Sequence, residues 1–102
     1  MTLIKVGLEA DFLKGFMKPL DLGGKTIVIA NVAGKLYAFD DRCTHLGGHL
    51  SKGLLAENVV TCPLHGSQFD VTTGERKAGP ARKPIVTYPA KVVNGEIFIE
   101  MA

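Results

Sequence analysis

Short stretches in which apolar and β-branched residues alternate with polar ones run along the whole chain. Gly and Pro residues cut these stretches apart, a pattern typical of the strands of a small all-β protein. The segments 26–29 and 97–99 are especially rich in side chains that favour a pleated, half-buried surface. The pattern predicts strands over Leu3–Val6, Phe16–Leu22, Lys25–Val32, Lys35–Asp40, Asn58–Thr61, Ser67–Val71, Ile85–Tyr88, Ala90–Val93 and Glu96–Glu100.

Two dipeptides that separate predicted strands are typical of tight hairpin turns. These are Ala33-Gly34 and Asn94-Gly95. The Asn-Gly pair suits a type I′ turn especially well, because both central residues of that turn need positive φ. Only Glu9–Leu13 has any helical character, and it is too short for more than one turn. The sequence therefore predicts an all-β fold.

Length and charge limit the classes of function. The chain has 102 residues, and we expect residues 1–102 to form one domain. A net charge of +2 and the absence of Trp argue against a nucleic-acid-binding protein. No apolar run approaches the roughly 20 residues of a membrane span. The N-terminal stretch lacks the features of a signal peptide, so we expect a cytoplasmic protein, in which cysteines more often bind metal or stay reduced than form disulfides.

Two segments interrupt the succession of strands, and each carries one Cys and one His. Cys43 and His45 have one residue between them, whereas Cys62 and His65 have two, and sixteen residues separate the two pairs. Glycines follow both pairs and allow the backbone to curl around a common point. Two thiolates and two imidazoles suit zinc, or an iron–sulfur centre in which two histidines replace two cysteines.

With this arrangement the chain resembles a Rieske-type ferredoxin of the soluble, low-potential, oxygenase-associated type. The resemblance covers nearly the whole chain in length and strand order, and its specificity lies in the two Cys-His boxes. It implies a Rieske iron–sulfur fold of three small antiparallel sheets, with a two-loop cluster-binding part at about residues 41–83. It also implies one [2Fe–2S] cluster, with Cys43 and Cys62 on the inner iron and His45 and His65 on the outer iron.

The resemblance further implies which side chains surround the cluster. The Ser67 hydroxyl would donate a hydrogen bond to a sulfide; the alternative is that it only satisfies a backbone group. The segment that contains Pro80 would cover the cluster, where the alternative is a plain turn. Leu46, Leu50 and Leu64 would form a hydrophobic collar beside the ligands, unless they belong to the core.

The expected reduction potential is low to intermediate. Neutral imidazoles make the cluster less negative than four thiolates do, and Rieske centres accordingly span about −150 to +300 mV, against about −400 mV for plant-type ferredoxins. The high-potential relatives add a disulfide between the two loops and a tyrosine hydroxyl. In this sequence Gly48, Leu64 and Phe69 stand at the matching positions.

The supply of ligands limits what the chain does alone. An oxygenase commonly needs a second iron on two His and one carboxylate, and only His49 remains once the cluster is ligated. We interpret His49 as an ordinary polar loop residue.

The resemblance implies a one-electron carrier, not an enzyme, that acts as a monomer and transiently contacts a flavin reductase and a terminal oxygenase. The alternatives are a redox-sensing or small subunit of a reductase complex, and a zinc-stapled interaction module.

Four cationic residues flank the Pro80 segment: Arg76, Lys77, Arg82 and Lys83. Such charge runs are usually solvated faces. The functional alternative is an electropositive rim that steers an acidic redox partner.

Overall fold

The computed structural model describes residues 2–44, 47–64 and 66–101. Its elements in chain order are β1 (Thr2–Leu8), η1 (Glu9–Asp11), β2 (Met17–Leu22), β3 (Lys25–Val32), β4 (Lys35–Asp40), η2 (Leu50–Lys52), β5 (Leu54–Ala56), β6 (Val59–Thr61), β7 (Gln68–Asp70), β8 (Arg76–Ala78), β9 (Thr87–Tyr88), β10 (Ala90–Val93) and β11 (Glu96–Met101). Both η elements are single turns of 3-10 helix. Within the described ranges, no helix has the length and apolar character needed to cross a membrane.

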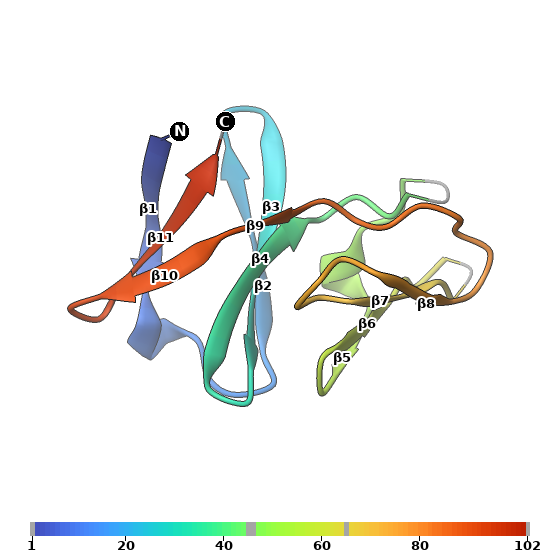
Figure 1. Ribbon diagram of the computed structural model, residues 1–102, viewed down its shortest axis with the longest axis horizontal. Helices are drawn as coiled ribbons and strands as arrows, with labels where there is room; N and C mark the ends of the chain where they lie inside the picture. The colour runs from blue at the N-terminus through green and yellow to red at the C-terminus, as the bar shows by residue number, and fades with distance from the viewer. Residues whose placement is uncertain (1, 45–46, 65, 102) are drawn as a thin grey trace.

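The strands form three antiparallel sheets, which confirms the predicted all-β fold. Their strand orders are β1-β11-β10, β2-β3-β4-β9 and β5-β6-β7-β8. The first two sheets lie together and form what we call the base, residues 2–40 and 84–101 (Figure 1). The third sheet and its loops form the distal part, residues 41–83, at the other end of the long axis. The chain enters the distal part after β4 and returns to the base with β9.

Strand β3 joins the base to the distal part, because both of its faces are covered. Ile27 and Ile29 point into the core between the two base sheets. Val28 and Ala30 point the opposite way and belong to a second core that also contains Phe69 of β7. Successive residues of a strand alternate between its faces. Burial of both faces therefore explains why this strand is a continuous apolar run instead of a strict alternation.

The two predicted hairpin turns are confirmed. At Ala33 and Gly34 φ is 54° and 93°, and at Asn94 and Gly95 it is 52° and 78°. Two successive positive φ values are the signature of a type I′ turn, whose twist matches that of the flanking strands. These turns set the register of β3 with β4 and of β10 with β11.

The sequence pattern misses β5 and β8 of the distal sheet. Each has three residues, and only the middle residue of β5 and the last of β8 are even partly buried. No alternation is detectable in so short a segment, so pairing with β6 and β7 decides their conformation. The strand expected over Ile85–Tyr88 is limited to its last two residues, and the Ile85 N–H donates to the carbonyl of Gly74 in the turn after β7.

Candidate metal centre

The two cysteines lie at the junction between the loops of the distal part and the core. Cys43 follows the end of β4, and Cys62 directly follows β6. Their exposed fractions are only 1% and 2%, and both belong to the core that contains Val28 and Phe69. A Cβ built on Gly48 of the first loop would lie 3.1 Å from the Sγ of Cys62. The first loop is thus packed directly against the cysteine of the second.

Both loops have the same backbone hydrogen-bond pattern. The carbonyl of Cys43 accepts from the N–H of Gly47 at 2.9 Å, and the N–H of Cys43 donates to the carbonyl of Gly48 at 2.8 Å. The second loop repeats both bonds. The carbonyl of Cys62 accepts from the N–H of Gly66 at 3.1 Å, and the N–H of Cys62 donates to the carbonyl of Ser67 at 2.8 Å. The two glycines have φ of 73° and 76°, a conformation that residues with a Cβ rarely adopt. The different Cys-His spacings give no indication that the two loops share this hydrogen-bond pattern. The sequence does indicate it in another way, because a glycine lies four positions after each cysteine.

Three of the predicted site residues, His45, Leu46 and His65, lie outside the described residues. Among residues 2–44, 47–64 and 66–101, no group of three or more His, Cys, Asp and Glu side chains could hold a metal ion. Cys43 and Cys62 are therefore the part of the predicted ligand set that the structure places. Two buried sulfur donors at the meeting point of two loops fit a centre that thiolates bind from the core side.

The Ser67 hydroxyl has a backbone partner and still has a proton to donate. Its side chain is buried, and its Oγ accepts a hydrogen bond from the N–H of Ala81 at 3.0 Å. A hydroxyl both accepts and donates, so this bond fixes the oxygen and leaves the O–H for another acceptor. The backbone role that the sequence left open is therefore real. It is compatible with the expected hydrogen bond to a sulfide.

A third segment, residues 79–83, crosses between the two loops, and we call it the bridging segment. The Ala81–Ser67 bond ties it to the second loop. At its other end, the Oγ1 of Thr44 donates to the carbonyl of Lys83 at 2.7 Å, which ties it to the first loop. Pro80 lies in this segment and is exposed. The segment is thus fixed to both cysteine-bearing loops.

Arg76 holds the bridging segment from the side of β8. Its Nε donates to the carbonyl of Ala81 at 2.7 Å, and its Nη2 donates to the carbonyl of Gly79 at 2.5 Å. These two carbonyls stand on either side of Pro80. From the sequence, Arg76 is only one of the four charged residues that flank the Pro80 segment. No spacing in the sequence predicts that Arg76 binds these carbonyls, because the contact depends on how the chain turns from β8 into the bridging segment.

Leu64 lies at the surface of the second loop, with an exposed fraction of 55%. A Cβ on Gly48 would come within 2.7 Å of its Cδ1, so the leucine lies against the first loop. An exposed apolar side chain here is not part of the core. Leu50, in contrast, is fully buried and belongs to the core that contains both cysteines, so the collar interpretation is wrong for Leu50. For Leu64 the collar stays a prediction.

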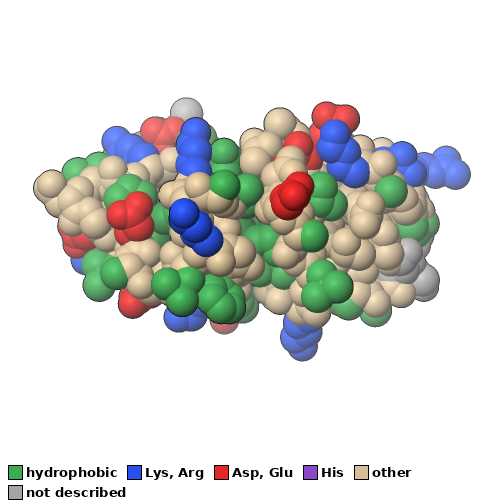
Figure 2. Space-filling view, turned by 90° about the horizontal axis from the view of Figure 1, so that it is seen from below, with side chains coloured by type: hydrophobic (Ala, Val, Ile, Leu, Met, Phe, Trp, Pro, Cys, Tyr) green, Lys and Arg blue, Asp and Glu red, His purple; other side chains and the backbone are tan. Residues whose placement is uncertain are grey.

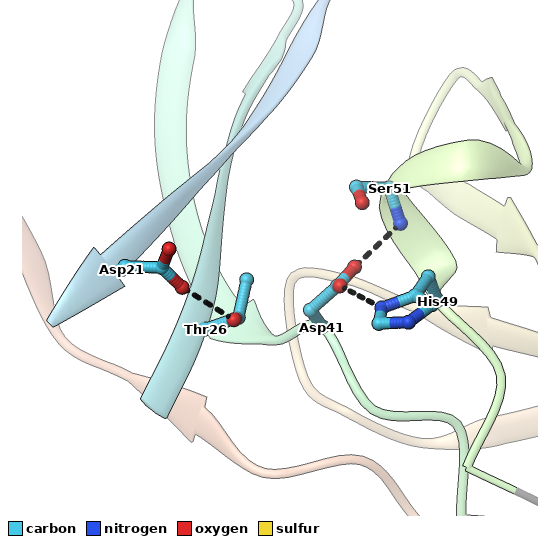
Figure 3. A network of polar contacts seen from close by, with 5 residues as sticks. All are labelled: Asp21, Thr26, Asp41, His49 and Ser51. Atoms are coloured by element: carbon cyan, nitrogen blue, oxygen red, sulfur yellow. Dashed lines mark hydrogen bonds and ion pairs between the residues drawn. The ribbon is translucent and has the colours of Figure 1, made fainter. Parts of the chain in front are cut away.

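A polar network supports the start of the first loop (Figure 3). The buried carboxylate of Asp41 accepts the N–H of Ser51 at 2.7 Å and the Nδ1–H of His49 at 2.8 Å. Burial by itself would raise the pKa of Asp41. The hydrogen bonds from Ser51 and His49 outweigh that effect and hold the pKa below its ordinary value. His49, interpreted from the sequence as an ordinary loop residue, therefore has a specific partner and joins the two ends of the first loop.

With this geometry established, comparison with known proteins identifies the family. The Rieske [2Fe–2S] domain family matches residues 2–89, a range that includes both cysteine-bearing loops. This match decides between the two centres that the sequence left open. The centre of this family is a [2Fe–2S] cluster and not zinc.

Individual relatives cover almost the whole chain. The ferredoxin component of the naphthalene 1,2-dioxygenase system of Pseudomonas putida is 36% identical over 93 residues, which are 91% of this chain and 89% of the relative. The solved Sphingomonas yanoikuyae B1 ferredoxin superposes with a TM-score of 0.92 at 28% identity, covering 99% of this chain and 100% of that one. A chain in the solved complex of reduced oxygenase and oxidized ferredoxin of carbazole 1,9a-dioxygenase gives a TM-score of 0.90 at 31% identity, covering 95% and 91%. The protein therefore belongs to the Rieske [2Fe–2S] domain family, as a Rieske-type ferredoxin that carries one [2Fe–2S] cluster and transfers electrons instead of catalysing a reaction itself.

Proposed function

We propose that this protein is a soluble, cytoplasmic and monomeric carrier of one electron from a flavin reductase to a terminal oxygenase. The observation that carries the proposal is the similarity to a dioxygenase ferredoxin component over 91% of this chain and 89% of the relative. The chain in the solved oxygenase–ferredoxin complex points to the same kind of acceptor. Aromatic compounds are the expected substrates of the oxygenase.

Cys43 and Cys62 would hold the inner iron of the cluster, and His45 and His65 the outer iron. When bound, the cluster supplies reversible one-electron chemistry. The burial of both cysteine side chains supports their assignment to the inner position. The surrounding set would be Ser67, Pro80, Leu64 and Leu46.

The chain's own residues divide this task between its two parts. The distal part, residues 41–83, holds the two loops with repeated backbone hydrogen bonds and the bridging segment. The base anchors that part through the core that Val28 and Ala30 share with both cysteines. Because this core excludes water behind the cysteines, an electron has its short route out through the exposed loops. Residues 1–102 would form one domain, in which the distal part holds the cluster and the base anchors the distal part.

Oxygenation itself would take place in another protein. His49, the one histidine outside the two boxes, is hydrogen-bonded to Asp41 and supports the first loop. A redox sensor or reductase subunit would also contain the cluster. It would not need to pass its electron to an oxygenase, and this difference separates the two functions by experiment.

The test follows electron transfer directly. The ferredoxin is reduced anaerobically with one electron and mixed in a stopped-flow instrument with oxidised terminal oxygenase from the same organism. We expect the visible spectrum of the ferredoxin to return to its oxidised form, with one electron delivered per chain. A flavin reductase with NADH should then reduce the ferredoxin again. A ferredoxin that stays reduced in the presence of the organism's oxygenases would contradict the carrier function and favour the sensor.

Replacing Ser67 with Ala is expected to lower the reduction potential. A hydroxyl hydrogen bond to the cluster stabilises the more negative, reduced state, and a bond to a charged acceptor contributes about 1.5–3 kcal/mol. Only the difference between the two oxidation states counts. We expect roughly 1 kcal/mol, or about 40 mV on the one-electron scale of 59 mV per tenfold. Protein-film voltammetry measures the shift. The control is Thr26→Val, which removes a hydroxyl of the base that bonds to Asp21 and should leave the potential unchanged.

An unchanged potential in Ser67→Ala would mean that the hydroxyl serves only the N–H of Ala81.

A further inference from the structure

The excess positive charge of this protein lies entirely in the distal part. Residues 41–83 contain six Lys and Arg against four Asp and Glu, whereas the base contains six of each sign. Two of the four acidic side chains, Asp41 and Asp70, are buried and hydrogen-bonded. The exposed surface of the distal part is therefore more positive than the count alone indicates.

Three cationic residues lie where the two cysteine-bearing loops meet. Arg82 and Lys83 are exposed and follow Ala81 in the bridging segment, which is tied to the second loop at Ala81 and to the first loop at Lys83. Arg42 is exposed and lies across the first loop, since a Cβ on Gly47 would be 3.4 Å from its Nε. Arg42 and Lys83 also line one hollow together with Cys43 and with Asp40, whose carboxylate pairs with Lys25 of the base. We call Arg42, Arg82 and Lys83 the cationic rim.

No acidic partner neutralises the rim within the described part of the chain. The ion pairs there join Lys5 to Glu96, Lys25 to Asp40, Lys77 to Glu75, and His49 to Asp41. None of them includes a residue of the rim.

The two exposed acidic residues of the distal part lie on the turns between β5 and β6 and between β7 and β8. Both turns are at the ends of their hairpins opposite to the cysteine-bearing loops (Figure 1). On the face seen in Figure 2, Lys and Arg side chains project at the distal end beyond the visible Asp and Glu side chains.

We propose that the cationic rim docks an acidic surface patch on the terminal oxygenase, and the inference rests on the proposed function. The rim lies at the junction of the two loops that would hold the cluster, so a partner must come close to the rim to receive the electron. Unpaired charges of one sign raise the rate of encounter with a surface of the opposite sign, by 10-fold to 1,000-fold at low salt. Salt screens this attraction over about 8 Å at physiological ionic strength.

The experiment compares two double variants with the same net charge. Arg82→Glu with Lys83→Glu reverses two charges of the rim. Lys14→Glu with Lys91→Glu reverses two exposed charges of the base that also form no ion pair with described residues. Each reduced protein is mixed with oxidised terminal oxygenase over a range of salt concentrations. In a separate arm, the anion ferricyanide and the cation hexaammineruthenium(III) replace the oxygenase as small oxidants.

At low salt we expect the rim variant to transfer electrons to the oxygenase at least tenfold more slowly than the wild type, and the base variant at nearly the wild-type rate. The difference should disappear at high salt. With ferricyanide the wild-type rate should fall as salt is added, and with hexaammineruthenium(III) it should rise; the rim variant should reverse both trends. The reduction potential of each variant is measured as well, because a change in driving force would persist at high salt whereas a docking effect would not.

Equal oxygenase rates for the rim variant and the base variant would overturn the docking proposal, even if the small oxidants detect a positive rim. Loss of rate that persists at high salt would also overturn it. If wild-type ferredoxin transfers no electron to the oxygenase, the proposed function fails together with the docking. The ferricyanide result would still report the charge of the rim in that case, so the two failures are distinguishable.

Discussion

Replacing Cys62 with Ala is expected to abolish cluster binding, and His45→Ala and His65→Ala are expected to do the same. Wild-type protein should contain two iron and two acid-labile sulfide per chain, and these variants close to none. The removal of a ligand also removes the binding free energy that orders the loops, because a metal site absent from the unfolded chain contributes its binding energy to folding. Metal and sulfide analysis, with the visible spectrum, measures the loss.

The matched control for the histidine variants is His49→Ala. His49 lies in the same loop region but bonds to Asp41, and we do not assign it as a ligand. This variant should keep its iron, its sulfide and the Rieske spectrum while losing some stability. A colourless His49→Ala protein beside a coloured His45→Ala protein would contradict the ligand assignment.

Replacing Gly53 with Ala is expected to destabilise the distal part more than any other glycine substitution outside the loops. A Cβ at Gly53 would lie 1.8 Å from the carbonyl oxygen of Thr61, which immediately precedes Cys62. The oxygen belongs to the backbone and cannot move aside without breaking the pairing of β5 with β6. Overpacking typically costs about 1–3 kcal/mol, and we expect the upper end of that range here because the contact is with a backbone oxygen. Thermal unfolding followed by circular dichroism, and bleaching of the cluster absorbance, should both shift to lower temperature.

Gly95→Ala is the control for this prediction. Gly95 has φ of 78°, so alanine is strained there by about 1–2 kcal/mol, but no atom lies within 4 Å of the added Cβ. Gly53 has a negative φ of −88°, so its substitution tests the close contact and not the backbone conformation. A smaller loss of stability in Gly53→Ala than in Gly95→Ala would show that the strands separate easily and that the contact is unimportant.

The sequence by itself predicted the long strands and the kind of centre. Strands β3 and β11 were predictable because each has enough β-branched and apolar residues to indicate its conformation locally. The type I′ turns were predictable because only particular residues adopt two successive positive φ values. The two Cys-His boxes indicated a mixed sulfur and nitrogen centre, since ligand chemistry depends on residue type and spacing. The family match then chose the [2Fe–2S] cluster.

Only the tertiary structure decided how the distal part is held together. Strands β5 and β8 are too short to be detected locally, and they form because β6 and β7 offer them backbone partners. The contacts of Arg76 with the carbonyls beside Pro80, and of Thr44 with Lys83, join residues that no periodicity connects. The same holds for the cationic rim, because its charges become a surface only when the bridging segment crosses both loops. Local propensity and ligand chemistry depend on short stretches of sequence and can be predicted from them. Contacts between distant segments depend on the path of the whole chain, so only the tertiary structure decides them.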